Sequence, residues 1–303
     1  MAKPGRTTPV PGEARELEAG LRVILAPNPS PMTHWGTNTY LLGEGEVTLI
    51  DPGPALPAHM AAILAALRRG ERIGRILVTH AHLDHSPLAR PLAAATGAPV
   101  LAFGDARAGR SAAMAALAAT GGLEGGEGVD LAFRPDEALP DGAEIALGGA
   151  TIRALHTPGH FGNHMTFLWN GLAFCGDHVM GWASSLVAPP DGDMAEYMAS
   201  LDRLAALRAR RFLPGHGDPI EDPAARIAAL RAHRLEREAQ ILAALADRPA
   251  TAAELAARIY LDTPPALMAA AARNVLAHLL DLRARGLVQG DDPPGPTARH
   301  ALV

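Results

Sequence analysis

The chain has 303 residues, enough for one large domain or for a large domain and a small one. Hydrophobic residues make up 48% of it and aromatic residues only 4%, so the core must be mainly aliphatic. The net charge of −5 gives no general attraction to nucleic acid or anionic membrane, and a single cysteine, Cys175, excludes an internal disulfide. No apolar run approaches the roughly 20 residues of a spanning helix, and the N-terminal stretch lacks a signal-peptide core. We therefore expect a soluble, cytoplasmic protein that does not bind membranes.

The first third of the chain predicts alternating strands and helices. An N-terminal arm over residues 1–20 leads into the first strand, and the next two strands form a β-hairpin around a repeated Gly-Glu pair. The expected strands cover residues 21–25, 38–42, 47–50, 75–79 and 99–103, and the expected helices cover residues 58–67 and 87–95. This alternation predicts an α/β layered domain, in which ligand sites lie at the carboxyl ends of strands.

The middle of the chain predicts two further hairpins. Residues 111–119 are compatible with a helix, and the glycine-rich residues 121–128 are typical of a flexible loop. One hairpin turns at a Gly-Gly pair at 148–149, and the other at an Asn-Gly pair at 170–171, which favours a tight turn. A helix over 194–209 then precedes a last strand.

The pattern becomes helical near residue 222. A capping box over Thr251 to Glu254 opens the second of three expected helices. A short β-wing and a proline-rich tail follow the third helix, and three helices with a wing predict a winged-helix unit. We therefore expect a catalytic domain over residues 1–222 and a small, helical winged-helix-like domain over residues 223–303.

Metal-ligating residue types are concentrated in one short stretch. His80, His82, Asp84 and His85 directly follow the buried strand at 75–79. Side chains on a strand repeat with period two, so His80 and His82 point the same way, and the following turn lets Asp84 and His85 reach a second ion. Three further strand ends carry His160, Asp177 and His216. Five imidazoles and two carboxylates suit two divalent metals with an open position for water, whereas one structural zinc needs only four ligands.

These residues resemble the motifs of the metallo-β-lactamase superfamily. The matching segments are Thr79 to His85, Thr157 to His160, Gly176-Asp177 and Pro214 to Gly217. The resemblance implies an α/β fold, a four-layer αβ/βα sandwich with the metals at its edge. It also implies a division of the ligands: His80, His82 and His160 on the first metal, Asp84, His85 and His216 on the second, with Asp177 bridging the two.

A closer resemblance covers nearly the full length and points to the lactamase-beta-like-2 group. The segments that resemble this group are Asn28 to Met32, Gly36 to Leu41, His160 to Met165 and the winged-helix tail. Mitochondrial members of that group are single-strand endoribonucleases, which implies RNA as a substrate. However, residues 247–303 carry six arginines and six acidic residues, so their charge is balanced. A surface that binds nucleic acid is normally basic.

We expect a dinuclear metal-dependent hydrolase. Two cations lower the pKa of a bridging water towards about 7, and the resulting hydroxide attacks an ester, thioester or lactone. Zinc is the expected ion, with iron or manganese as alternatives. Asp84 and Asp177 are the expected catalytic carboxylates, Asp177 by orienting the hydroxide, and His164 or a metal-bound water donates the proton.

Three alternatives remain open from the sequence. The first is a single-strand endoribonuclease, and the second is a winged-helix nucleic-acid-binding module with structural metals. The third, a redox di-iron enzyme, is disfavoured because such relatives tend to carry glutamate where this chain has His82. A small-molecule substrate is therefore the expected partner, with single-stranded RNA as the alternative. A homodimer is left open, as is whether the tail binds nucleic acid, covers the site or pairs subunits.

Other side chains are expected around the metals. Asp51 ends a strand and either supports a metal ligand or only caps a turn. Trp182, Ser184 and Ser185 follow Asp177 closely and either shape the substrate pocket or form an ordinary surface loop. The remaining histidines, which are expected to serve packing or to lie on the surface, are His34, His59, His156, His178, His233, His278 and His300.

Overall fold

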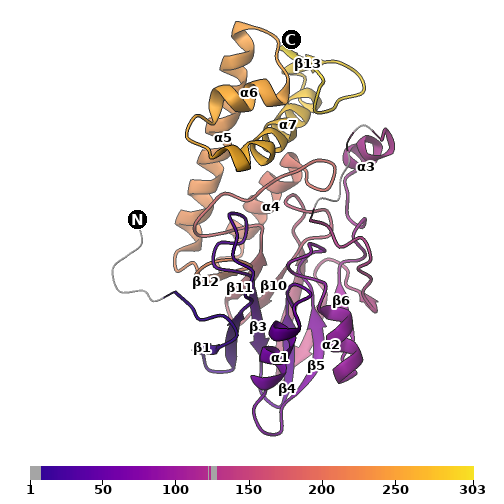
Figure 1. Ribbon diagram of the computed structural model, residues 1–303, viewed down its shortest axis with the longest axis vertical. Helices are drawn as coiled ribbons and strands as arrows, with labels where there is room; N and C mark the ends of the chain where they lie inside the picture. Colours follow the sequence, from indigo (N-terminus) through magenta and orange to yellow (C-terminus); the bar gives the residue numbers. More distant parts are fainter. Residues whose placement is uncertain (1–7, 122, 124–127) are drawn as a thin grey trace.

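Two β-sheets stacked face to face form the body of the molecule, and a group of helices sits on one end of them (Figure 1). This computed structural model describes residues 8–121, 123 and 128–303. Part of the expected N-terminal arm and most of the expected glycine-rich loop at 121–128 therefore lie outside the described residues. Within them, no helix is both long and apolar enough to cross a bilayer.

The first sheet has seven strands in sequence order, β1 to β7. Their bounds are β1 (Ala14–Glu18), β2 (Leu21–Leu25), β3 (Asn38–Leu42), β4 (Glu46–Ile50), β5 (Arg72–Leu77), β6 (Val100–Ala102) and β7 (Glu137–Ala138). The expected β3–β4 hairpin is confirmed, and β4 to β7 run parallel to one another. The edge strands β1 and β7 were not predicted, because both are largely exposed and carry no apolar run.

The second sheet has five strands in the order β12-β11-β10-β9-β8. Their bounds are β8 (Glu144–Leu147), β9 (Ala150–His156), β10 (Met165–Trp169), β11 (Leu172–Gly176) and β12 (Arg211–Pro214). Both predicted hairpin turns are confirmed, and all four turn residues at 148–149 and 170–171 have positive φ. Glycine and asparagine tolerate that conformation, which the tight hairpin turn requires at both of its central positions.

Helices cover the outer face of each sheet, which gives the predicted four-layer αβ/βα sandwich. The helices α1 (Pro57–Ala65) and α2 (Ala89–Thr96) pack on the first sheet, and α4 (Met194–Ala206) packs on the second. Strand β3 shows why the strands are apolar throughout: Leu41 faces the outer helices, whereas Tyr40 and Leu42 face the core between the sheets. The helix α3 (Ala112–Ala119) begins after Ser111, whose hydroxyl caps it as N-cap.

The C-terminal part has the expected winged-helix character. It contains α5 (Pro223–Asp247), α6 (Ala252–Ile259), η1 (Pro265–Leu267), α7 (Met268–Ala284), β13 (Val288–Gly290) and β14 (His300–Leu302). The capping box is confirmed, since Thr251 and Glu254 each bond the other's backbone N–H. Helix α5 links the two parts: Ile227 and Leu230 pack with α4, whereas Ile241 and Leu245 pack with α6 and α7. The division at 222/223 stays a prediction.

Candidate metal centre

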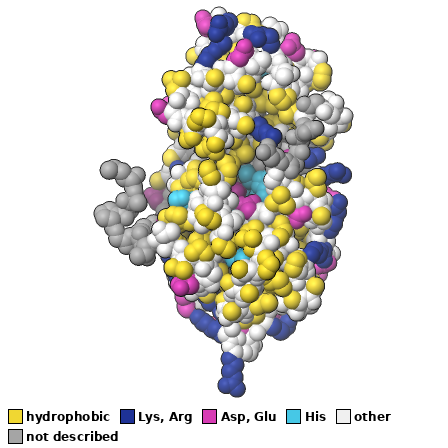
Figure 2. Space-filling view, in the orientation of Figure 1, with side chains coloured by type: hydrophobic (Ala, Val, Ile, Leu, Met, Phe, Trp, Pro, Cys, Tyr) yellow, Lys and Arg dark blue, Asp and Glu magenta, His cyan; other side chains and the backbone are white. Residues whose placement is uncertain are grey.

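The strand ends of both sheets meet at one edge and bring seven polar side chains together there. Strand β5 leads into the stretch from His80 to His85, and the turn after β9 carries His160. Asp177 directly follows β11, and His216 follows β12 by two residues. Figure 2 shows histidine and acidic side chains in a hollow between the sandwich and the C-terminal helices. The seven predicted ligands thus divide into two groups of four that share one residue.

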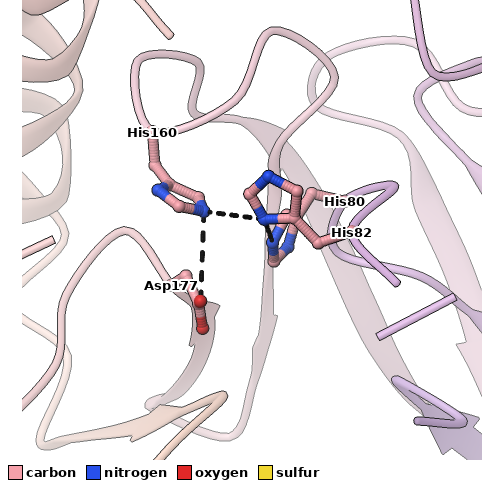
Figure 3. Close-up of side chains that lie close together, drawn as sticks. All are labelled: His80, His82, His160 and Asp177. Carbon is pink, nitrogen blue, oxygen red and sulfur yellow. Dashed lines mark hydrogen bonds and ion pairs between the residues drawn. The ribbon is translucent and has the colours of Figure 1, made fainter. Parts of the chain in front are cut away.

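The first group, here called the histidine-rich set, comprises His80, His82, His160 and Asp177. Nδ1 of His82 lies 2.8 Å from Nε2 of His80 and 3.2 Å from Nε2 of His160. Oδ2 of Asp177 lies 3.9 Å from Nε2 of His160. Figure 3 shows these rings and the carboxylate pointing toward one another from separate loops. Four candidate ligand atoms within 4.8 Å of one another could hold a cation.

The second group, the acidic set, comprises Asp84, His85, Asp177 and His216. Nε2 of His85 lies 3.4 Å from Oδ2 of Asp84 and 3.4 Å from Oδ1 of Asp177. Nε2 of His216 lies 3.1 Å from Oδ2 of Asp84 and 3.2 Å from Oδ2 of Asp177. Asp177 belongs to both sets, so its carboxylate can offset the repulsion between two neighbouring cations.

Two buried atoms of the acidic set test whether a metal fits. Nε2 of His85 and Oδ1 of Asp177 are buried and make no hydrogen bond among the described residues; they lie 3.4 Å from each other, as charged partners only. Buried nitrogen and oxygen atoms without hydrogen bonds are costly unless something binds them. A cation that both atoms ligate would remove that cost, so the residues fit a divalent metal.

Asp51 lies behind the sets and orients two histidines. Its Oδ2 accepts a hydrogen bond from Nδ1 of His85 at 2.9 Å and from the hydroxyl of Thr79 at 2.8 Å. The same hydroxyl lies 3.0 Å from Nδ1 of His80, which can donate to it. A proton on Nδ1 leaves the Nε2 lone pair of each ring for a metal. Asp51 has a φ of 51° and is therefore held in an uncommon conformation at the end of β4.

Backbone carbonyls orient the other two Nε2 ligands. Nδ1 of His160 donates to the carbonyl of Leu186 at 2.6 Å, and Nδ1 of His216 donates to the carbonyl of Gly36 at 3.0 Å. His216 is thus oriented by a loop that precedes β3. His160 is oriented instead by the segment that follows Asp177.

The C-terminal helices hold that segment from both sides of Leu186. The guanidinium of Arg234, on α5 and almost fully buried, donates to the carbonyl of Ser185. Oδ1 of Asn274, on α7, accepts from the backbone N–H of Val187 at 3.0 Å. The carbonyl that orients His160 is therefore fixed by contacts with the C-terminal part of the chain.

The two sets differ in their electrostatics. Burial lowers the pKa of His216, but Asp177 and Asp84 outweigh that effect and raise it to about 10. His85 follows the same pattern, because Asp84, Asp177 and Asp51 hold its pKa well above the ordinary value despite burial. In the histidine-rich set, burial and neighbouring rings lower the pKa of His82 to about 3. The acidic set therefore attracts positive charge strongly, whereas the rings of the other set stay neutral.

Two further predicted site residues, His164 and Ser185, are buried. His164 is fully buried, with Nδ1 3.0 Å from the hydroxyl of Thr157 and a ring centroid 5.2 Å from that of His80. Ser185 is also fully buried, and its hydroxyl donates to the carbonyl of His178 at 3.0 Å. The candidate ligands His80 and His85 are buried to the same degree, so the predicted roles of His164 in proton transfer and of Ser185 near the substrate stay predictions.

Trp182 and Ser184 line an open cleft, and their part in shaping a substrate pocket stays a prediction. His34, which was expected to serve packing or to lie on the surface, stacks on Trp182 with ring centroids 4.8 Å apart and on Trp35 at 4.3 Å. It has a positive φ of 56°.

Comparison with known proteins agrees with this geometry. A family model described as the metallo-beta-lactamase superfamily matches residues 32–216, and one described as the beta-lactamase associated winged helix domain matches residues 251–293. The chain belongs to the metallo-beta-lactamase superfamily, whose members are mostly hydrolases. The predicted fold and the predicted resemblance are both confirmed.

Named relatives cover most of the chain. It is 34% identical to a beta-lactamase-like protein 2 homolog from Drosophila melanogaster, over 91% of this chain and 92% of the relative. It is 35% identical to an atrochrysone carboxyl ACP thioesterase from Aspergillus fumigatus, over 73% of this chain and 64% of the relative. A crystal structure of a beta-lactamase domain protein from Burkholderia ambifaria superposes with a TM-score of 0.81 at 26% identity, covering 99% of this chain and 96% of that one.

Proposed function

We propose that this hydrolase binds two divalent cations and cleaves an ester or thioester bond of a small molecule. The observation that carries the proposal is the position of Asp177 in both four-residue sets. A single structural cation would use only one of these sets and would leave the other set of buried polar atoms unpaired. Zinc is the expected ion, and iron or manganese could use the same imidazole and carboxylate donors.

The residues divide the work between holding cations and moving protons. When bound, two divalent cations would lower the pKa of a water molecule and polarise the carbonyl of the substrate. Asp177 offers Oδ1 toward His85 and Oδ2 toward His216 and His160, so it can serve both sets. The side chain of Asp84 is 27% exposed, the largest exposure among the carboxylates of the two sets. Asp84 can therefore accept a proton from a water molecule that enters from the open side.

The substrate class is supported by two observations. One relative with 35% identity is named a thioesterase, which supports a thioester as the substrate. The cleft beside the sets is lined by uncharged side chains, which gives no cationic surface for a nucleic-acid backbone. The sequence-based alternative, cleavage of single-stranded RNA, would have only the neutral polar side chains of this cleft, such as Ser184 and Asn274, for contacts with phosphate.

The test combines metal analysis with a substrate panel. Purified protein is analysed for bound metals and assayed on p-nitrophenyl esters, acyl thioesters, a lactone and single-stranded RNA. We expect two equivalents of metal per chain and hydrolysis of the ester or thioester substrates, with activity lost after chelation and restored by metal. RNA cleavage without ester or thioester hydrolysis would refute the proposed substrate class. Full activity in metal-free protein would refute the metal-dependent mechanism.

A further inference from the structure

An apolar cleft of about 190 Å³ lies where three parts of the chain meet. One wall comes from the loop before β3, one from the segment after Asp177, and one from the C-terminal helices. The lining residues are Pro31, Met32, Met180, Trp182, Ala183, Ser184, Leu186, Tyr260, Thr263, Leu267, Ala270, Ala271 and Asn274. Figure 2 shows hydrophobic side chains bordering the hollow that contains the histidines.

Two of the lining residues connect the cleft to both metal sets. The carbonyl of Leu186 accepts the hydrogen bond from Nδ1 of His160, in the histidine-rich set. Trp182 packs so closely on Gly217 that a Cβ there would lie 2.8 Å from Cδ1 of the indole. Gly217 directly follows His216, in the acidic set. The lining residues Leu186 and Trp182 thus contact a ligand of the histidine-rich set and the residue that follows a ligand of the acidic set, which places the cleft on the side of both sets that these segments cover.

The walls lack charge and carry adaptable apolar groups. None of the described residues that line the cleft is an arginine, lysine, aspartate or glutamate. Met32 is 44% exposed and Trp182 is 38% exposed, although both are large and apolar. Methionine side chains adjust to irregular ligands, and exposed apolar surface beside a polar site marks a place where a ligand binds.

We propose that this cleft binds an uncharged apolar acyl or aryl group of the substrate, so that the hydrolase prefers hydrophobic esters or thioesters. This inference rests on the proposed function and adds the chemical class of the group that is cleaved off. A cavity of roughly 150 Å³ is enough for benzene, so 190 Å³ accommodates a phenyl ring or a medium-length acyl chain. The α7 helix supplies Ala270, Ala271 and Asn274, which makes the C-terminal part a determinant of specificity.

A chain-length series and one matched pair of variants test the proposal. Substrates are p-nitrophenyl esters and acyl thioesters with acyl groups from acetyl to decanoyl. Ala270→Trp fills the cleft, and Ala269→Trp places the same side chain on an exposed position of α7 outside the cleft. Metal content and circular dichroism establish that both variants are folded and loaded.

For the parent protein, kcat/KM is expected to rise about fourfold for each added methylene until the cleft is full. Ala270→Trp is expected to lower kcat/KM at least about tenfold for the preferred long acyl group and less than about twofold for acetyl. Ala269→Trp should leave both values unchanged. A second readout needs no catalysis: the uncharged fluorophore N-phenyl-1-naphthylamine should bind metal-free parent protein and Ala269→Trp, but not Ala270→Trp.

The outcomes separate this inference from the proposed function. Hydrolysis that does not depend on chain length, together with equal behaviour of the two variants, overturns the apolar cleft and leaves the hydrolase intact. Absence of hydrolysis on every ester and thioester overturns the proposed function itself. If probe binding is also the same in both variants, the cleft is not an apolar binding site.

Discussion

The histidine-rich set and the acidic set share Asp177, but different parts of the chain orient them. In the acidic set, His85 is held by Asp51 at the end of β4, and His216 by the carbonyl of Gly36. In the histidine-rich set, His160 is held by a carbonyl that α5 and α7 fix in place. The first sheet therefore supports the acidic set and, through Thr79, also His80 of the histidine-rich set, whereas the C-terminal helices support only His160.

The two sets also differ in what a cation must displace. Carboxylates raise the pKa of His216 to about 10, so its ring carries a proton at neutral pH when no metal is present. Burial lowers the pKa of His82 to about 3, so its ring is already neutral. A metal entering the acidic set must therefore release a proton, whereas one entering the histidine-rich set finds neutral imidazoles beside the carboxylate of Asp177.

The largest expected effect comes from removing the shared carboxylate. Asp177→Ala should lose both metals and lower hydrolysis at least about a thousandfold, because each set loses its common ligand. His216→Ala should lose one equivalent and retain the other, since His216 belongs to the acidic set alone. Mass-spectrometric metal analysis after dialysis measures both stoichiometries. Asp202→Ala, at an exposed position on α4, is the control.

This prediction has a clear contrary result. If Asp177→Ala keeps one full equivalent of metal, the carboxylate is not shared between two ions. If His216→Ala loses both ions, the two sets do not bind independently, and the comparison between them fails.

Removing the carboxylate of Asp51, which orients His85, should lower metal binding less than removing Asp177 does. Asp51→Asn replaces the oxygens that accept from His85 and Thr79 with an amide that can satisfy only some of those bonds. We expect metal affinity at the acidic set to fall about 10- to 100-fold, with a weaker effect on the other set. Titration of metal-free protein with cobalt, followed by its absorption bands, measures the two affinities. Equal loss at both sets would contradict separate support.

Much of this site could be predicted from the sequence, and the reason is local. Each ligand lies shortly after a strand, so its place at the end of that strand is set by neighbouring residues, whereas the meeting of ligands from both sheets was implied by the family resemblance. The capping box at Thr251 and Glu254 is local in the same way. The contacts of His34 with Trp182 and of Asn274 with Val187 join segments distant in the chain. Such contacts depend on the packing of the whole fold, which no local pattern specifies, and the burial of His164 was missed for the same reason.

Support of the histidine-rich set by the C-terminal helices gives a third prediction. Asn274→Leu removes the acceptor for the N–H of Val187, next to the carbonyl that orients His160. We expect metal affinity at this set to fall about tenfold, while the acidic set stays unchanged. The same cobalt titration measures it, and Ala269→Leu on the exposed side of α7 is the matched control. A weaker acidic set with an unchanged histidine-rich set would reverse the assignment.

The smallest expected effect is on stability, and it concerns how burial changes the pKa of a histidine. His278 on α7 is buried without a carboxylate partner, and burial lowers its pKa to about 3. It is thus neutral when folded but takes up a proton near pH 6.5 when unfolded. The contribution of neutral His278 to the free energy of unfolding is fully present above pH 6.5 and is lost as the pH falls toward 3. Between pH 7.5 and 5.5, wild-type protein should lose about 1.4 kcal/mol more unfolding free energy than His278→Leu, measured by urea denaturation of metal-free protein. Equal losses would show that burial beside Arg234 does not keep His278 neutral in the folded protein.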